Sequence, residues 1–240
     1  MIAVPYHLGK RGVEVGEGPL RIVEALGCDA VFIESDDGVA GVNRRLTDCV
    51  AMAKKPAIIL AGNCNSCIGT LAALENPGIV WFDAHGDFNT PETTVSGAFE
   101  GMSLAVATGH CHREMMATPV REENVVLAAT RSFDALEAQR LERSKIKIVS
   151  IDAVQHAVDA LPCKDIYLHI DLDVLDPSIS PGVNFSEPGG ILPEQLFNAV
   201  RHVIATKKLA AAAISNFRPS LDKEQKTLKI ACELVAILTS

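Results

Sequence analysis

Three potential metal ligands alternate with small residues in the segment Trp81–Asp87, which reads WFDAHGD. Side chains two residues apart on an extended chain point to the same face, so Asp83, His85 and Asp87 would enter one small volume. Carboxylates this close repel each other unless one stays protonated or a divalent cation lies between them. The alternative is a strand end with solvated charges, because exposed aspartates are common. We favour a metal site at the end of a strand that contains Ile79–Phe82.

A second pair of carboxylates, Asp171 and Asp173, follows another apolar run in the segment IDLDVLDP. An EF-hand calcium loop is excluded because its glycine position holds Asp176 and its final glutamate position holds Gly182. The spacing also allows a mononuclear Mg²⁺ site. Four aspartates and a histidine from two strand ends are nevertheless better suited to two cations than to one.

Cys64 follows a third apolar run and precedes a predicted helix. A helix N-terminus lowers the pKa of a thiol, which would make Cys64 a metal ligand or a nucleophile. It could also be a small buried apolar residue, or form a redox pair with Cys67. The redox pair fits poorly with a carboxylate cluster elsewhere in the chain.

The remaining histidines show no metal-binding pattern. His110 and His112 flank Cys111, but adjacent residues on a helix or turn diverge and do not converge on one ion. No partner is recognisable for His7, His156, His169 and His202. The polar loop Phe88–Gly101 is either a capped turn or a loop that hydrogen-bonds a small polar substrate.

Eight short apolar runs alternate with longer amphipathic segments and must position these residues. The predicted strands are Ile2–Pro5, Ala30–Ile33, Ala57–Ala61, Ile79–Asp83, Val125–Ala129, Ile146–Ser150, Ile166–Asp171 and Ala210–Ser215. The predicted helices are Pro19–Leu26, Val39–Ala53, Ser66–Glu75, Ala135–Arg143, Ala153–Leu161, Pro193–Thr206 and Asp222–Leu238. This alternation predicts a parallel sheet covered on both faces, in a single domain over residues 1–240. Sites in such sheets lie beyond the carboxyl ends of the strands.

Composition narrows the classes of function. The chain of 240 residues is 48% hydrophobic, which is enough for one large core. Its net charge of −8 and aromatic content of 5% argue against nucleic-acid and membrane-surface binding. Seven cysteines, an odd number, do not indicate a disulfide framework. Because Met1–His7 shows no signal-peptide pattern, we expect a cytoplasmic protein.

With these motifs the chain resembles the ureohydrolase superfamily, which includes arginase and agmatinase. The similar segments are RGVE to GP near the N-terminus, DAHGDFN, DLDVLDPSISPG, and EPGG within Val183–Leu192. The resemblance implies a three-layer α/β/α sandwich with an eight-stranded parallel sheet and a dinuclear manganese site. It also implies that Asp83 and Asp171 bridge the two ions, that Asp87 completes one coordination shell, and that His85 and Asp173 complete the other.

Three positions depart from the family pattern. Cys64 stands where the family has its other histidine ligand, and Glu100 stands where it has an active-site histidine. Asn216 replaces the glutamate that pairs with the guanidinium cation. Arginine is always charged and would need that glutamate, so an amide suits a less basic group such as an N-hydroxyguanidine. The family includes a branch that hydrolyses hydroxyarginine.

The resemblance also implies how the substrate is held. Asn89, Thr94 and Ser96 match the positions that bind the α-carboxylate in arginases, and Asp134 matches the one that binds the α-amine. Both sets together suggest an α-amino acid and not agmatine. The oligomeric state is left open, although the chain ends soon after its last predicted helix and so should lack the long C-terminal extension with which some arginases form trimers.

We therefore expect a hydrolase with two manganese ions, acting on Nω-hydroxy-L-arginine or L-arginine, in which Asp87 and Glu100 take part in catalysis. One alternative is a hydrolase for another guanidino or amide substrate. The other is an inactive member of the family that acts as a binding protein.

Overall fold

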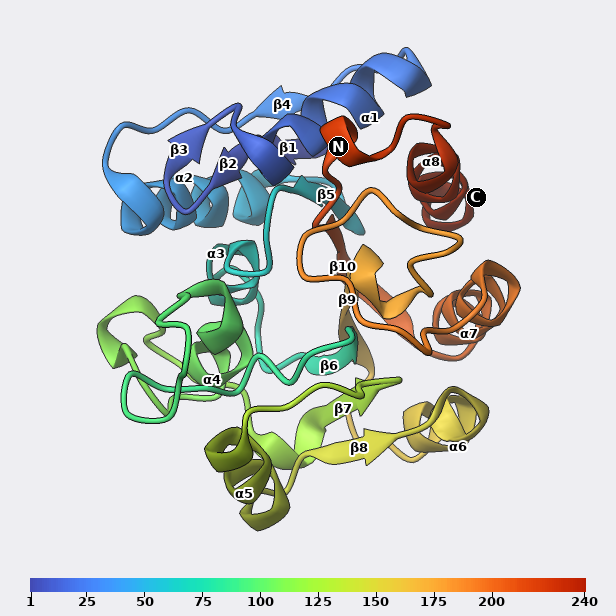
Figure 1. Cartoon of the computed structure of the whole chain (residues 1–240). Coiled ribbons are helices and arrows are strands. Elements are labelled where there is room, and N and C mark those ends of the chain that lie inside the picture. The colour runs from blue at the N-terminus through green and yellow to red at the C-terminus, as the bar shows by residue number, and fades with distance from the viewer.

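Eight strands form one parallel sheet in the computed structural model, which describes all 240 residues. In spatial order they are β4 (Val31–Phe32), β1 (Ile2–Val4), β5 (Ala57–Ala61), β10 (Lys208–Ser215), β9 (Asp165–Asp171), β6 (Gly78–Phe82), β7 (Val125–Ala128) and β8 (Lys147–Val149). Figure 1 shows this order from β4 at the top of the view to β8 at the bottom. Each of the eight predicted strands coincides with one of these, with small shifts at the ends.

Strands β5 and β6 carry no polar side chain, because both faces of the sheet are covered. In β5, Ile58 and Leu60 pack into one hydrophobic cluster and Ile59 packs into a second cluster on the opposite face. Strand β6 divides in the same way, with Val80 in the first cluster and Trp81 in the second. Alternation of side chains along a strand produces this division.

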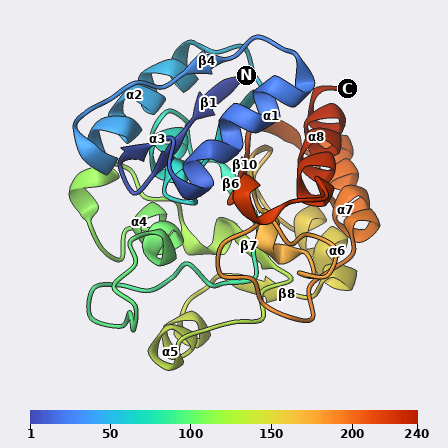
Figure 2. The same ribbon diagram turned by 45° about the horizontal axis from the view of Figure 1, so that its top comes forward.

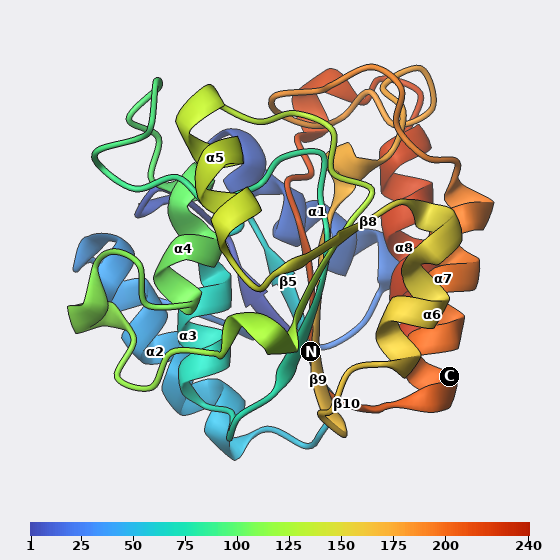
Figure 3. The same cartoon turned by 90° about the horizontal axis from the view of Figure 1, so that it is seen from below.

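Helices cover the sheet on both faces, as Figures 1 and 3 show. On one face lie α1 (Gly18–Leu26), α6 (Val154–Asp159), α7 (Pro193–Thr206) and α8 (Lys226–Thr239). On the other lie α2 (Gly38–Met52), α3 (Ser66–Ala72), α4 (Ser103–Ala107) and α5 (Ala135–Arg143). In Figure 2, α1 and α8 lie side by side. The predicted α/β/α sandwich with an eight-stranded parallel sheet is confirmed.

Some local predictions were wrong. A short antiparallel hairpin, β2 (Tyr6–His7) with β3 (Lys10–Arg11), and helix α4 were not predicted. Helix α8 begins at Lys226, four residues later than predicted, and the Asp222 carboxylate accepts the N–H groups of Thr227 and Leu228 in its first turn. No helix of the structure is long and apolar enough to cross a membrane.

The four central strands β5, β10, β9 and β6 are neighbours, so their carboxyl ends meet at one edge of the sheet. Cys64, Asn216, Asp171 and Asp83 lie at or just beyond those four ends. Segments far apart in the sequence therefore deliver their side chains to one place.

Candidate metal centre and active site

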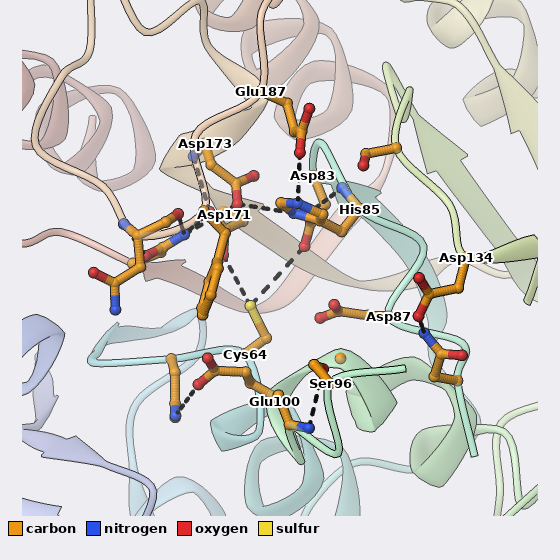
Figure 4. A pocket seen from close by; sticks show the side chains of 18 of the residues that line it. Cys64, Asp83, His85, Asp87, Ser96, Glu100, Asp134, Asp171, Asp173 and Glu187 are labelled. Carbon is orange, nitrogen blue, oxygen red and sulfur yellow. Dashed lines mark hydrogen bonds and ion pairs between the residues drawn. The ribbon is translucent and has the colours of Figure 1, made fainter. Parts of the chain in front are cut away.

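A cavity of about 390 Å³ opens at the carboxyl edge of the central strands. The predicted site residues that line it are Cys64, Asp83, His85, Asp87, Asn89, Ser96, Glu100, Asp134, Asp171, Asp173 and Asn216. Figure 4 shows Cys64 between Asp171 and Asp83, with Glu100 and Asp134 farther out in the same pocket. Thr94 does not line the cavity, because its hydroxyl faces the surrounding loop and accepts the N–H of Gly97 at 3.0 Å.

The carboxylates of Asp83 and Asp171 are buried and oriented by fixed donors. Asp83 accepts the indole N–H of Trp81 at 3.0 Å and the backbone N–H of His85 at 2.7 Å. Asp171 accepts the backbone N–H of Asp173 at 2.8 Å. Each acid is thus held at the end of its own strand before any ligand arrives.

Asp87 is buried, yet its Oδ2 atom has no hydrogen-bond partner. The backbone of Asp87 has a φ angle of +48°, a region that residues other than glycine seldom adopt. Its main-chain oxygen accepts the N–H groups of Leu104 and Ala105, which hold this conformation in place. Asp87 lines the cavity, and a buried carboxylate oxygen without a partner fits a coordination bond to a cation.

Mutual repulsion and burial make this cluster unfavourable without a cation. Burial first, and the charges of Asp173 and Asp83 next, raise the pKa of Asp171 well above its ordinary value. Burial and the charge of Asp83 likewise raise the pKa of Asp87, and they raise the pKa of Asp173 to about 6. Divalent cations would relieve this repulsion, so the donor set fits a metal centre.

His85 pairs with two of these acids through one ring nitrogen. Its Nδ1 atom lies 3.1 Å from Asp173 Oδ2 and 3.5 Å from Asp83 Oδ1. Burial lowers the pKa of His85, but the hydrogen bonds and charges of Asp173 and Asp83 outweigh burial and raise the pKa to about 12. The ligand atoms of these three residues all lie within 4.8 Å of one another, which is compatible with one shared ion.

The Cys64 thiol donates to Asp171 Oδ2 at 2.9 Å and lies 3.9 Å from Asp83 Oδ2. Burial and the neighbouring charge of Asp171 raise the pKa of the thiol well above its ordinary value. The sequence-based expectation of a lowered thiol pKa is therefore wrong, because these two effects outweigh the helix N-terminus. Only a bound cation would make the thiolate favourable.

Comparisons with known proteins agree with this geometry. The family model described as "Arginase family" matches residues 9–239. The chain is 31% identical to the arginase of Bacillus subtilis, over 99% of this chain and 96% of that protein. The chain belongs to the arginase family.

Solved structures of the arginase family have the same fold. The crystal structure of the Bacillus subtilis arginase superposes with a TM-score of 0.86 at 30% identity, covering 99% of this chain and 96% of that one. An Entamoeba histolytica arginase, solved in complex with L-ornithine, gives 0.88 at 25% identity over 100% and 97% of the two chains. A formimidoylglutamase from Bacillus subtilis gives 0.80 at 17% identity over 99% and 84%, a likeness of fold alone. The protein is accordingly a metal-dependent hydrolase of the arginase family.

His169, which lies beside the candidate metal centre, was missed by sequence reasoning. It is fully buried, stacks on Trp81 with ring centroids 3.6 Å apart, and its Nδ1 atom lies 2.9 Å from the Tyr167 hydroxyl. Its ligand atom lies within 4.8 Å of those of Cys64 and Asp83. Burial lowers its pKa to about 3, so the imidazole is neutral. Its place two residues before Asp171, on the same face of the strand, could have revealed it.

Asn216 forms hydrogen bonds to two of the carboxylates. Its amide nitrogen donates to Asp171 Oδ1 at 2.8 Å and to Asp173 Oδ2 at 3.1 Å, and its carbonyl oxygen accepts the N–H of Asn184 at 2.9 Å. Its φ angle is +69°, a conformation that asparagine tolerates better than most residues. The side chain is thus a neutral group in contact with two of the acids.

Two acids lie at the other end of the cavity. Asp134 Oδ2 accepts the amide N–H of Asn89 at 3.0 Å. Glu137, which sequence reasoning missed, is buried and accepts the backbone N–H groups of Phe88 at 2.8 Å and Asp134 at 3.1 Å. The spacing of Asp134 and Glu137 is that of a capping box, which was the available signal. Glu137 therefore joins α5 to the loop that follows Asp87.

Arg131, just after β7, fixes the loops around the site. Its guanidinium donates to the main-chain oxygens of Asp173 at 2.9 Å, Glu187 at 2.8 Å and Val174 at 3.1 Å. A fourth residue, Pro188, accepts from the Arg131 Nε atom through its main-chain oxygen at 3.1 Å. This one cation holds two loops of the cavity wall together.

Proposed function

We propose that the protein hydrolyses a C–N bond in the guanidino group of an arginine-like α-amino acid, and that it prefers Nω-hydroxy-L-arginine to L-arginine. The observation that carries this proposal is the neutral amide of Asn216 in contact with Asp171 and Asp173. A carboxylate at this position would pair with a permanently charged guanidinium, and an amide would not.

Two manganese ions would occupy the carboxylate cluster. Their ligands, on this proposal, are Asp83 and Asp171 for both ions, Asp87 and Cys64 for one, and His85 and Asp173 for the other. When bound, the ions would lower the pKa of a water molecule and polarise the guanidino group. The unpartnered Asp87 Oδ2 and the mutual repulsion of the buried acids support this assignment.

Asp87 and Glu100 are the proposed proton-transfer groups. Hydrolysis forms a C–O bond and breaks a C–N bond, so a proton must leave the attacking water and another must reach the leaving amine. Asp87 lines the cavity beside the proposed ions, and its carboxylate oxygen that is not bound to metal would accept the water proton. Glu100 lines the same cavity, is held by the amide of Asn63 at 3.0 Å, and would donate to the leaving nitrogen.

The α-amino-acid end of the substrate would lie against Asn89, Ser96 and Asp134. All three line the cavity, and Asp134 supplies a negative charge for an α-ammonium group. Thr94 would act indirectly, since it lies 3.4 Å from the Ser96 hydroxyl and shapes the turn around it. One acid for the α-ammonium group, beside the neutral hydrogen-bonding groups of Asn89 and Ser96, suits an amino acid better than an amine without a carboxylate.

The preference between substrates follows from desolvation. An N-hydroxyl group withdraws electrons and lowers the pKa of a guanidinium, so part of the substrate arrives uncharged. A carboxylate at position 216 would then be a buried anion without a cation, which is costly. The neutral Asn216 amide avoids that cost: its N–H groups donate to Asp171 and Asp173, and its carbonyl oxygen, which accepts one N–H from Asn184, keeps a second lone pair for a neutral group.

A comparison of Asn216→Glu with Asn216→Gln tests this reasoning. The two variants have side chains of the same size and differ in charge. We expect the parent to have a kcat/KM at least about tenfold higher for Nω-hydroxy-L-arginine than for L-arginine, which corresponds to about 1.4 kcal/mol. Asn216→Glu should narrow this ratio and Asn216→Gln should not. Equal or better turnover of L-arginine by the parent would refute the preference.

Product identity and metal content distinguish the proposed hydrolase from a hydrolase with another substrate and from an inactive binding protein. Hydroxyurea and ornithine, or urea and ornithine, are the products expected from a panel of guanidino compounds with added Mn²⁺. Turnover of a different guanidino or amide compound would change the substrate and keep the reaction class. A protein that binds no metal and hydrolyses none of them would be an inactive relative with a binding role.

A further inference from the structure

His7 contacts Glu100 although it lies outside every motif that predicted the site. Its Nε2 atom lies 3.4 Å from Glu100 Oε2, the same oxygen that accepts the amide N–H of Asn63. Its other ring nitrogen, Nδ1, lies 3.2 Å from Glu14 Oε2. One imidazole therefore connects two carboxylates through its opposite nitrogens.

These three side chains form a path from the cavity to the surface. Glu100 lines the cavity and is 15% exposed, His7 is 16% exposed, and Glu14 is 44% exposed. Glu14 begins a 3-10 helix at the protein surface. Arg218, which follows β10, lies 3.7 Å from Glu14 and is the nearest cation to the outer end of the path.

The backbone around His7 is closely packed, which fixes the imidazole relative to Glu100. Gly62 approaches the main-chain oxygen of Tyr6 so closely that an added Cβ atom would lie 2.0 Å from it. A Cβ on Gly16 would lie 3.1 Å from the His7 backbone nitrogen. The β2–β3 hairpin is thus pressed against the loop that carries Asn63.

The proposed reaction requires proton transfer, which this path could provide. Hydrolysis of a neutral N-hydroxyguanidine by one water yields hydroxyurea and a free amine, and the water supplies both protons that these products gain. The amine then takes one more proton from solvent to become an ammonium, because an alkyl amine of this kind has a pKa near about 10. In each turnover Glu100 gives a proton to the leaving nitrogen and must regain one before the next, while Asp87 releases the proton that it took from the water.

We propose that His7 is a positioning residue that acts through Glu100, holding its carboxyl group and passing it a proton taken up at Glu14. An imidazole accepts a proton at one nitrogen and releases one from the other, so each turnover would return the ring to its starting state after tautomer exchange. The inference rests on the proposed role of Glu100 as the group that protonates the leaving amine.

His7→Gln tests the relay, because glutamine can hold Glu100 by a hydrogen bond but cannot transfer a proton. We expect kcat to fall roughly 10- to 100-fold with little change in KM, toward the lower end of what general acid–base groups contribute. The matched control is His202→Gln, which removes an imidazole paired with Asp159 on the surface. In His7→Ala, added imidazole should restore activity, and the restoration should increase with the concentration of its protonated form.

The pH profile of kcat supplies a reading that a purely structural role would not change. The titratable groups that contact His7 are Glu14 and Glu100, and Arg218 contacts Glu14. His7→Gln should change the shape of this profile, and His202→Gln should leave it as in the parent. Glu14→Gln, a surface change that should not disturb folding, should make kcat depend on buffer concentration.

Two results would overturn the relay: a kcat for His7→Gln within about twofold of the parent, or a loss that neither imidazole nor buffer restores in either relay variant. The measurements use whichever guanidino compound the parent hydrolyses fastest. A preference for L-arginine would therefore refute the proposed substrate and leave the relay standing. A parent that hydrolyses no guanidino compound would overturn both.

Discussion

The Cys64 thiol should make metal binding more dependent on pH than the usual histidine ligand would. In the metal-free protein the thiol is buried, donates to Asp171 at 2.9 Å, and has a raised pKa because of burial and that acid. A metal ion binds the thiolate, so the proton must leave when the ion arrives.

The free-energy cost of deprotonating the Cys64 thiol has a lower bound. A thiol with an ordinary pKa of about 8.5 costs about 2 kcal/mol to deprotonate at pH 7.0, which weakens metal affinity roughly 30-fold. Because burial raises the pKa of Cys64 further, the cost should exceed this value. As pH rises toward the thiol pKa, the cost of deprotonating Cys64 becomes smaller. The affinity for the metal ion should therefore rise about tenfold per pH unit from this group alone.

The affinities for Mn²⁺ and Zn²⁺ can be measured between pH 7 and 9 by competition with a chelator. Their dependence on pH would reveal the proton released from Cys64. Cys64→Ser should have a slope of log affinity against pH that is lower by about one. Cys67→Ser is the matched control, because Cys67 is also buried but donates to the Ser103 main-chain oxygen and does not line the cavity. Equal slopes for the parent and Cys64→Ser would exclude a thiolate ligand. The acids of the cluster titrate in both proteins and cancel in the comparison.

Three further predictions concern the same site. Asp171→Ala should lose bound metal and activity while remaining folded, since this acid is proposed to bridge both ions; two ions per chain by elemental analysis would contradict that. Gly86→Ala should destabilise the protein by about 1–3 kcal/mol in urea denaturation, because its Cβ would lie 2.7 Å from Glu137 Oε1. Gly101→Ala, whose Cβ meets nothing within 4 Å, is the control, and an equal effect of the two would refute the steric argument. Asn216→Glu combined with Cys64→His should bind Mn²⁺ more tightly than Asn216→Glu alone, and additive effects in the double-variant cycle would exclude coupling between the two positions.

The strands and the acids at their ends were predictable because both depend on local sequence. An apolar run buried on both faces, such as Ile79–Phe82, indicates a parallel strand, and alternation of side chains then places Asp83 and His85 together. The same rule grouped Asp171 with Asp173, and both line the cavity, although Asp173 lies in the 3-10 helix Leu172–Val174 beyond β9. Alternation would also have included His169, but a lone histidine in an apolar strand carried no partner in the sequence.

Contacts between distant segments could not be predicted in this way. Nothing local indicates that β9 lies between β10 and β6, since this order depends on how all the strands pack together. His7 meets Glu100 only because a short hairpin folds over the loop before Cys64. Helix α4 was missed since its five residues are too few to show a helical period.

The departures at Cys64 and Asn216 are best understood as one change in the placement of charge. Compared with the family pattern, a Cys64 thiolate would add one negative charge to the metal centre, and Asn216 removes the one that the glutamate would carry. Both side chains contact the same acid, Asp171, at 2.9 and 2.8 Å. On the proposed ligand set, the summed charge of positions 64 and 216 would stay the same, while its location would move from a group facing the substrate to a ligand of the metal. A glutamate at position 216 together with the thiolate would place one more anion among buried acids whose pKa values are already raised by burial and mutual repulsion. A neutral amide at position 216 therefore adds no repulsion to a Cys64 thiolate. The same amide provides no negative charge to pair with the charged guanidinium of arginine.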